Sequence, residues 1–202
     1  MAIHVNLIDK IAEQTENMFN ITNFKGKELL DKFSDVYERL NDDWDGTDAV
    51  ANLTDLNTVY TAVSDLLSKL EKLTIGANDE AIGLQKDTVD NGGICAVGST
   101  LASALKFNSL RAPKNTGVTD AREGILQDAA DFNDMPTNFQ NLVDALNEAK
   151  TELFANWTEG GNRAEIERLF KEFNDNVGHY KSLITKVRDN INTVAENKKK
   201  RM

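Results

Sequence analysis

Hydrophobic residues recur at intervals of three and four along four long segments of the chain. The segments cover residues 27–43, 48–73, 137–156 and 166–194. Side chains spaced in this way lie on one face of an α-helix, so each segment is predicted to be an amphipathic helix. A shorter apolar pattern over residues 5–19 predicts one further helix. The pattern therefore predicts an all-α protein.

The fourth segment has the most regular pattern. Its apolar residues alternate in steps of four and three, as in the heptad repeat of a coiled coil, and Asn162 with Glu165 resembles the capping box that begins a helix. We expect part of this stripe to bind a partner, and we call that part the heptad seam. The heptad seam consists of Phe170, Phe173, Val177, Tyr180, Ile184 and Val187.

Residues 76–120 differ in composition from the helical segments. They contain six glycines, Pro113 and scattered Asn and Asp, which are residues of turns and loops. We therefore expect a connector with one or two short helices, of which a small buried helix from Ile94 to Phe107 is the strongest candidate. This divides the chain into a first helical hairpin over residues 1–75, the connector, and a second hairpin over residues 121–202 that ends in a basic tail.

The two hairpins look like copies of one unit. When the only two tryptophans, Trp44 and Trp157, are aligned, five apolar positions coincide between 15 and 4 residues upstream of each. In the two copies these are Leu29, Leu30, Phe33, Val36 and Leu40, and Leu142, Val143, Leu146, Ala149 and Leu153. Each copy is therefore predicted to consist of a helix, a short turn with tryptophan and glycine, and a second helix.

The turns themselves have a simple structural interpretation. Gly46 in the first turn, and Gly160 and Gly161 in the second, can adopt the left-handed conformation that ends a helix. A tryptophan at the end of one helix can fold onto the next and bury a large apolar surface. One alternative is that the turns have only a structural role, in which they hold together the two helices of an antiparallel hairpin.

The combination resembles the WXG superfamily of small type VII secreted proteins. Trp44-Asp45-Gly46 fits the family's Trp-x-Gly turn, and Trp157-Thr158-Glu159-Gly160 departs from it by one inserted residue. The resemblance covers roughly residues 27–73 and 137–196. Members of the family usually form single hairpins that pair into four-helix bundles, so two copies in one chain imply a fused dimer or the helical targeting domain of an effector.

One feature of the family is missing. The export signal of the family is a tyrosine followed four residues later by Asp or Glu, and none of Tyr37, Tyr60 and Tyr180 has an acidic residue at that position. The resemblance therefore implies that export would depend on a partner that supplies the signal.

Composition excludes several other functions. The net charge of −10 and the pI near 4.7 argue against general nucleic-acid binding, and the basic cluster from Lys198 to Arg201 is expected to be a solvated tail. The lone Cys95, for which we assign no role, cannot form an internal disulfide. The start of the chain lacks the pattern of a Sec signal peptide, and its longest apolar stretch is too short to cross a membrane.

The sequence contains no constellation typical of an enzyme. It has neither a phosphate-binding loop nor a nucleophile elbow, and His4 and His179 lie in no Glu-x-x-His pair of the kind that holds a di-iron centre. We therefore predict no enzymatic activity, no metal site and no cofactor.

Together, these patterns predict two antiparallel helical hairpins in an elongated four-helix bundle with a Gly-rich connector. The expected function is that of a binding protein in type VII secretion, either a substrate or a chaperone-like partner of a secreted effector, which docks helix to helix on another helical protein. It would be made in the cytoplasm and exported, if at all, without a Sec signal peptide. The alternative is a non-secreted structural bundle that self-assembles through the heptad seam.

Overall fold

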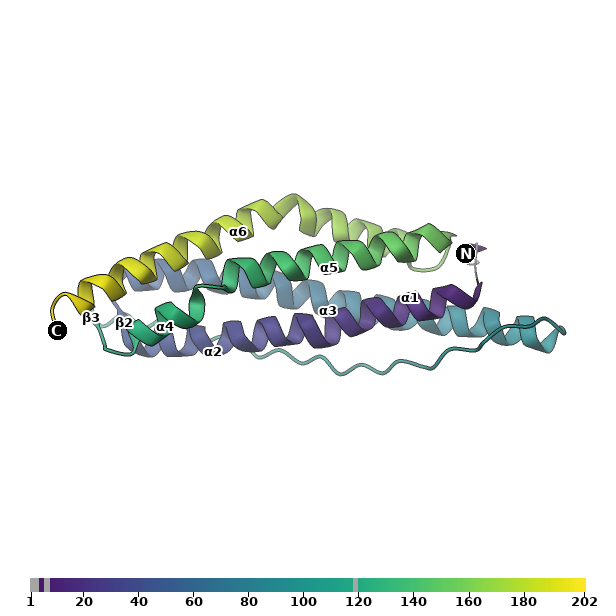
Figure 1. The fold of residues 1–202 in the computed structure, drawn as a ribbon, viewed down its shortest axis with the longest axis horizontal. Helices are drawn as coiled ribbons and strands as arrows, with labels where there is room; N and C mark the ends of the chain where they lie inside the picture. Colours follow the sequence, from purple (N-terminus) through teal and green to yellow (C-terminus); the bar gives the residue numbers. More distant parts are fainter. Residues whose placement is uncertain (1–3, 6–7, 118–119) are drawn as a thin grey trace. The chain divides into compact units, whose positions relative to one another are not determined.

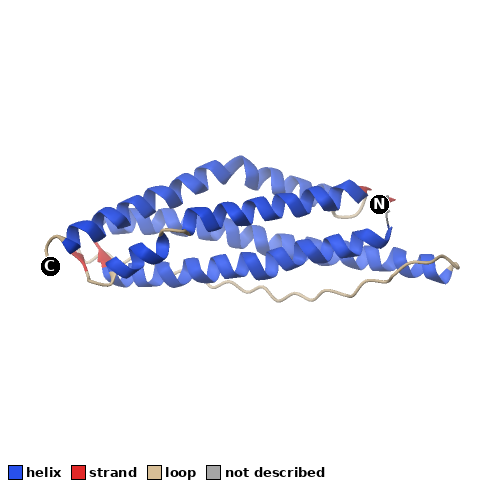
Figure 2. Ribbon diagram, in the orientation of Figure 1, coloured by secondary structure: helices blue, strands red, loops and turns tan. Residues whose placement is uncertain are grey.

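The computed structural model covers residues 1–202 and describes all of them except 1–3, 6–7 and 118–119. Most of the described chain is helical, as Figure 2 shows in blue, and the prediction of an all-α protein built from two helical hairpins is confirmed. The helices are α1 (Ile8–Asn20), a π-helical turn η1 (Ile21–Gly26), α2 (Lys27–Asp43), α3 (Thr47–Asp90), α4 (Ile125–Phe132), α5 (Met135–Asn156) and α6 (Arg163–Lys199) (Figure 1). Four very short strands accompany them: β1 (His4–Val5), β2 (Trp44–Asp45), β3 (Asp120–Ala121) and β4 (Trp157–Glu159).

The helices predicted from the apolar pattern are present, with one large difference in length. Helix α2 has the predicted limits, whereas α3 was expected to end near residue 73 and instead continues to Asp90. Two glycines that suggested a break, Gly76 and Gly83, lie inside the helix. At Gly76 a Cβ atom would lie 2.7 Å from the side-chain nitrogen of Asn162, so the close approach of a second segment accounts for that glycine.

The expected short helix from Ile94 to Phe107 is not formed. Residues 93–116 contain neither helix nor strand, and their side chains are exposed or half-buried. The small residues of this stretch have the spacing of a helix. In the structure, however, backbone N–H and C=O groups of the stretch form hydrogen bonds with side chains of α3, among them Gln85, Asn78 and Glu71. These bonds give the backbone of the stretch an alternative to helical hydrogen bonding.

The chain forms two compact units, and each is assembled from three separate segments. Unit 1 consists of Met1–Lys27, Asp65–Lys106 and Leu142–Asp175, and unit 2 of Glu28–Ser64, Phe107–Asn141 and Asn176–Met202. These units cut across the predicted divisions at residues 75 and 120, because each long helix contributes one part to each unit.

The core of each unit is made of the apolar faces of its helical segments. In unit 1 the fully buried side chains include Ile11, Met18, Leu67, Leu153, Trp157 and Phe170. In unit 2 they include Tyr37, Leu40, Leu53, Leu56, Phe132 and Ile184. Burial of stripes of this kind is the main stabilising contribution to a helical bundle.

Candidate functional site

The first tryptophan turn joins α2 to α3 in unit 2. Strand β2 pairs antiparallel with β3, which places Trp44 opposite Ala121, and the backbone N–H of Arg122 donates to the carbonyl of Asp43 at 2.7 Å. Trp44 is only 3% exposed. Gly46 has a φ of 105°, so the predicted left-handed glycine is present.

The second tryptophan turn joins α5 to α6 in unit 1. Strand β4 pairs antiparallel with β1, which places Trp157 opposite Val5. Trp157 is completely buried, and its indole N–H has no hydrogen-bond partner among the described residues, so the ring acts through packing. Arg163 closes the turn: its Nε donates to the Trp157 carbonyl at 2.7 Å, and its guanidinium lies 4.2 Å from the centre of the Phe154 ring. Gly160 and Gly161 both have positive φ, as predicted.

The strands extend the internal repeat beyond what the sequence indicated. Each copy begins with a two-residue strand, followed by a helix, a second helix, the tryptophan turn and a last helix. The opening strand of the first copy, β1, pairs with β4, which contains the tryptophan of the second copy. The opening strand of the second copy, β3, pairs with β2, which contains the tryptophan of the first copy. The two copies thus exchange their opening strands, and each tryptophan strand pairs with a strand of the other copy.

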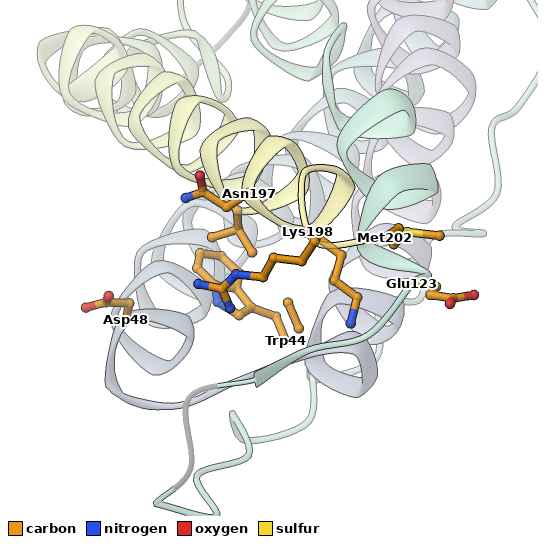
Figure 3. Close-up of a pocket in the computed structure, with 9 residues that line it drawn as sticks. Trp44, Asp48, Glu123, Asn197, Lys198 and Met202 are labelled. Carbon is orange, nitrogen blue, oxygen red and sulfur yellow. The ribbon is translucent and has the colours of Figure 1, made fainter.

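A hollow of about 600 Å³ adjoins the Trp44 turn. Figure 3 draws the residues that line it. Lys198 and Arg201, from the end of the chain, line it together with Asp48 and Glu123. In Figure 3 the carboxylates of Asp48 and Glu123 lie on opposite sides of the hollow and point away from it, so they form no pair for acid–base chemistry. No group of three or more His, Cys, Asp or Glu side chains in the described part of the chain is placed to hold a metal ion.

The heptad seam lies mostly within the protein. Phe170, Phe173, Ile184 and Val187 are buried, so in this conformation they pack against the chain itself. Only Val177 and Tyr180 are half-exposed. A partner could reach the centre of α6 without displacing core contacts, whereas binding along the whole seam requires the bundle to open.

The most extensive polar arrangement was not foreseen from the sequence. We call residues 98–116 the strap, because this extended segment is held by side chains of the helices rather than by backbone pairing. Its half-buried residues recur mostly at every third position, which is typical of a polyproline II conformation. They include Gly98, Leu101, Phe107, Leu110 and Pro113.

In unit 1 the strap is bound by three buried polar residues of α3, Glu71, Asn78 and Gln85, which lie seven residues apart. Gln85 accepts the N–H of Gly98 at 2.8 Å, and Asn78 donates to the carbonyl of Ser99 at 2.9 Å. Asn78 in turn accepts the hydroxyl of Thr15 on α1.

Glu71 makes the densest set of these contacts and is only 2% exposed. One carboxylate oxygen accepts the N–H groups of Ala104 and Leu105 at 2.8 and 3.1 Å, and the other accepts the hydroxyl of Ser103 at 2.7 Å. Desolvation by burial raises the pKa of this carboxyl, but these hydrogen bonds and one from Asn23 together hold the pKa below its ordinary value. Glu71 is therefore a charged group that binds backbone amides.

In unit 2 the strap is bound by α2 and α3. The hydroxyls of Tyr37 and Tyr60 donate to the carbonyls of Arg111 and Asn108 at 2.7 and 3.0 Å, and desolvation by burial raises the pKa of both tyrosines. Asn41 both donates to the carbonyl of Ala112 and accepts the N–H of Lys114.

Charged contacts fix the end of the strap in unit 2. Asp45, next to Trp44, accepts the N–H and the hydroxyl of Thr116, and these bonds lower the pKa of its carboxyl. Arg111 pairs with Glu38 and Asp42. The turn and the strap are therefore joined at Asp45.

Searches against protein-family models, curated proteins and solved structures found no match. Within the described residues, no helix is long and apolar enough to span a membrane.

Proposed function

We propose that this protein is a helical binding protein of a type VII secretion system, either a substrate or a partner that accompanies a secreted effector. One observation carries the proposal: the chain contains two copies of a helix–tryptophan turn–helix unit, and in both the tryptophan is buried and its strand pairs with a strand of the other copy. This arrangement is what the fusion of two hairpins that normally pair as separate chains would produce.

The proposed mechanism is docking of a partner helix on the centre of α6. Val177, Tyr180 and Leu183 lie three residues apart on one face of that helix and are half-exposed, so a partner can cover them without opening the core. Acidic residues outnumber basic ones by 33 to 23, which favours a partner with a basic face.

The first test is secretion from the native host, in strains with and without a functional type VII ATPase. Appearance of the protein in the medium only when the ATPase is functional is the expected result for a substrate. For an accompanying partner, we expect retention in the cell together with a type VII component in pull-downs. Retention in both strains with no such component would overturn the proposal and favour the non-secreted structural bundle.

The second test locates the docking face. The double substitution V177D/Y180E is expected to weaken capture of the partner by about tenfold or more. The matched control is S182E, which adds a charge at an exposed position of the same helical turn and should leave capture unchanged. Equal capture by both variants would exclude the centre of α6 as the docking face.

A further inference from the structure

Phe24 is an aromatic side chain on the surface of unit 1, and the π-helical turn η1 places it there. Thr22, Asn23 and Gly26 of the same turn are buried, whereas Phe24 is 69% exposed. A π-turn inserts one extra residue into a helix and redirects the side chains beyond it, and such turns are frequent at functional sites. Among the described Phe, Tyr and Trp residues, no other side chain is as exposed.

A groove runs beside Phe24, between α1–η1 and α5. A hollow of about 470 Å³ is lined on the α5 side by the small residues Ala145 and Ala149 and on the η1 side by Ile21. A second hollow of similar volume adjoins it and shares Asn17 and Glu152. The two together follow the helix from residue 10 to residue 25, which corresponds to about 22 Å at 1.5 Å per residue.

In the hollow beside Phe24, the charged residues have opposite signs on the two walls. Lys25 lines the η1 side, and Glu148 and Glu152, one helical turn apart, line the α5 side. None of these three side chains forms an ion pair within the described residues, in contrast to Lys10 and Glu13 farther along the groove, which pair at 2.7 Å. Within the described part of the chain, the groove therefore presents an unpaired cation opposite two unpaired carboxylates.

We propose that this face binds a second copy of the same chain in a two-fold symmetric dimer. A two-fold axis requires one patch to be complementary to itself, and this patch carries a protruding aromatic ring, a hollow of small residues beside it, and charges of both signs. Phe24 of each copy enters the hollow at Ala145 and Ala149 of the other, and Lys25 of each copy meets Glu148 and Glu152 of the other. This interface goes beyond the proposed function and uses a different surface from the centre of α6.

The test is the association of the purified full-length protein, measured by analytical ultracentrifugation from low micromolar to several hundred micromolar concentration. The wild type is expected to form a dimer reversibly. F24D should raise the dissociation constant by about tenfold or more, because an exposed aromatic anchor is replaced by a charge. The control I94D changes an even more exposed apolar residue outside the groove and should leave association unchanged. Circular dichroism will establish that both variants are folded.

Charge exchange tests the two-fold geometry. K25E alone and E148K/E152K alone should each dimerise more weakly, because like charges then face each other across the axis. An equimolar mixture of these two variants should recover dimers, since each glutamate then meets a lysine of the other chain. A wild type that stays monomeric, an F24D variant that associates as the wild type does, or a mixture that fails to recover would each overturn the proposal. Capture of a different protein through Phe24 by a monomeric wild type would likewise refute a second copy as the occupant.

Discussion

At the scale of single residues, Glu71 has the contacts that best explain how the strap is held. Its carboxylate lies almost completely out of water, which is unfavourable for a charge, yet it accepts two backbone N–H groups and a hydroxyl from the strap. Since hydrogen bonds to the charged form hold the pKa below its ordinary value, the ionised carboxylate stabilises the folded state.

The first prediction at this scale concerns pH. Because the pKa of Glu71 is lower in the folded than in the unfolded chain, its contribution to the free energy of unfolding is fully present above the ordinary value of 4.5. The contribution is lost as the pH falls through the lower pKa of the folded state. E71A should therefore lower the free energy of unfolding by about 1–3 kcal/mol at neutral pH, since it leaves backbone N–H groups without their acceptor. Urea unfolding at neutral and acidic pH measures this, and amide exchange at Ala104 and Leu105 locates it.

The matched control is E71Q, which keeps the shape of the side chain and removes its charge. Asp128 complicates the acidic range because it titrates in the opposite sense: desolvation raises its pKa despite the ion pair with Arg39, so its contribution falls as the pH rises. The difference between wild type and E71Q removes this common background. If the two proteins lose stability equally on acidification, Glu71 is not the group responsible.

At the scale of elements, the apolar pattern located helices better than it located their ends. The limits of α2 were predicted to the residue, because its stripe is continuous and Trp44-Asp45-Gly46 stops it. The end of α3 was missed because glycines at 76 and 83 usually break a helix, and packing against neighbouring segments overrode that preference. A signal was nevertheless present: Glu71, Asn78 and Gln85 repeat every seven residues, which places three polar side chains on one helical face.

The candidate sites, like the helices, were predicted in part from the sequence. The turn glycines and the burial of both tryptophans follow from residue types, since positive φ favours glycine and a hairpin end leaves apolar surface to cover. The strands β1 and β3 were missed because two residues carry no periodic signal. The burial of most of the heptad seam was also missed, because an apolar stripe does not reveal whether its cover is another helix of the same chain or a partner.

The prediction at this scale concerns the close contact of η1 with α3. A Cβ atom at Gly26 would lie 2.6 Å from Cδ1 of the buried Leu67, so G26A should force that side chain to move and cost about 1–3 kcal/mol. The control is G178A in α6, where a Cβ would meet no atom within 4 Å. Because alanine favours helix, G178A should stabilise the protein by about 0.5–1 kcal/mol. Denaturant unfolding measures both, and a G26A variant as stable as G178A would refute the close contact.

At the scale of the whole molecule, the two copies of the repeat are combined rather than placed end to end. Unit 1 contains α1 and the last part of α3 from the first copy together with the Trp157 turn of the second. Unit 2 contains α4 and the last part of α6 from the second copy together with the Trp44 turn of the first. Each unit therefore takes its core from both copies.

The two copies are therefore expected to stay together after the covalent link between them is cut. Residues 92–97 lie between the end of α3 and the strap and are exposed or half-buried, so a protease site introduced there should be cleaved without disturbing the helices. The two fragments should remain associated on gel filtration and separate only in denaturant, because both cores and both strand pairs draw on the two copies. The strap stays on the second fragment and keeps its bonds to Glu71, Asn78 and Gln85 of the first. E71A should then weaken the association of the cleaved fragments measurably, because the covalent link no longer maintains a high effective concentration of one half for the other. Fragments that separate under native conditions would show that each copy folds on its own and that the exchanged strands are incidental.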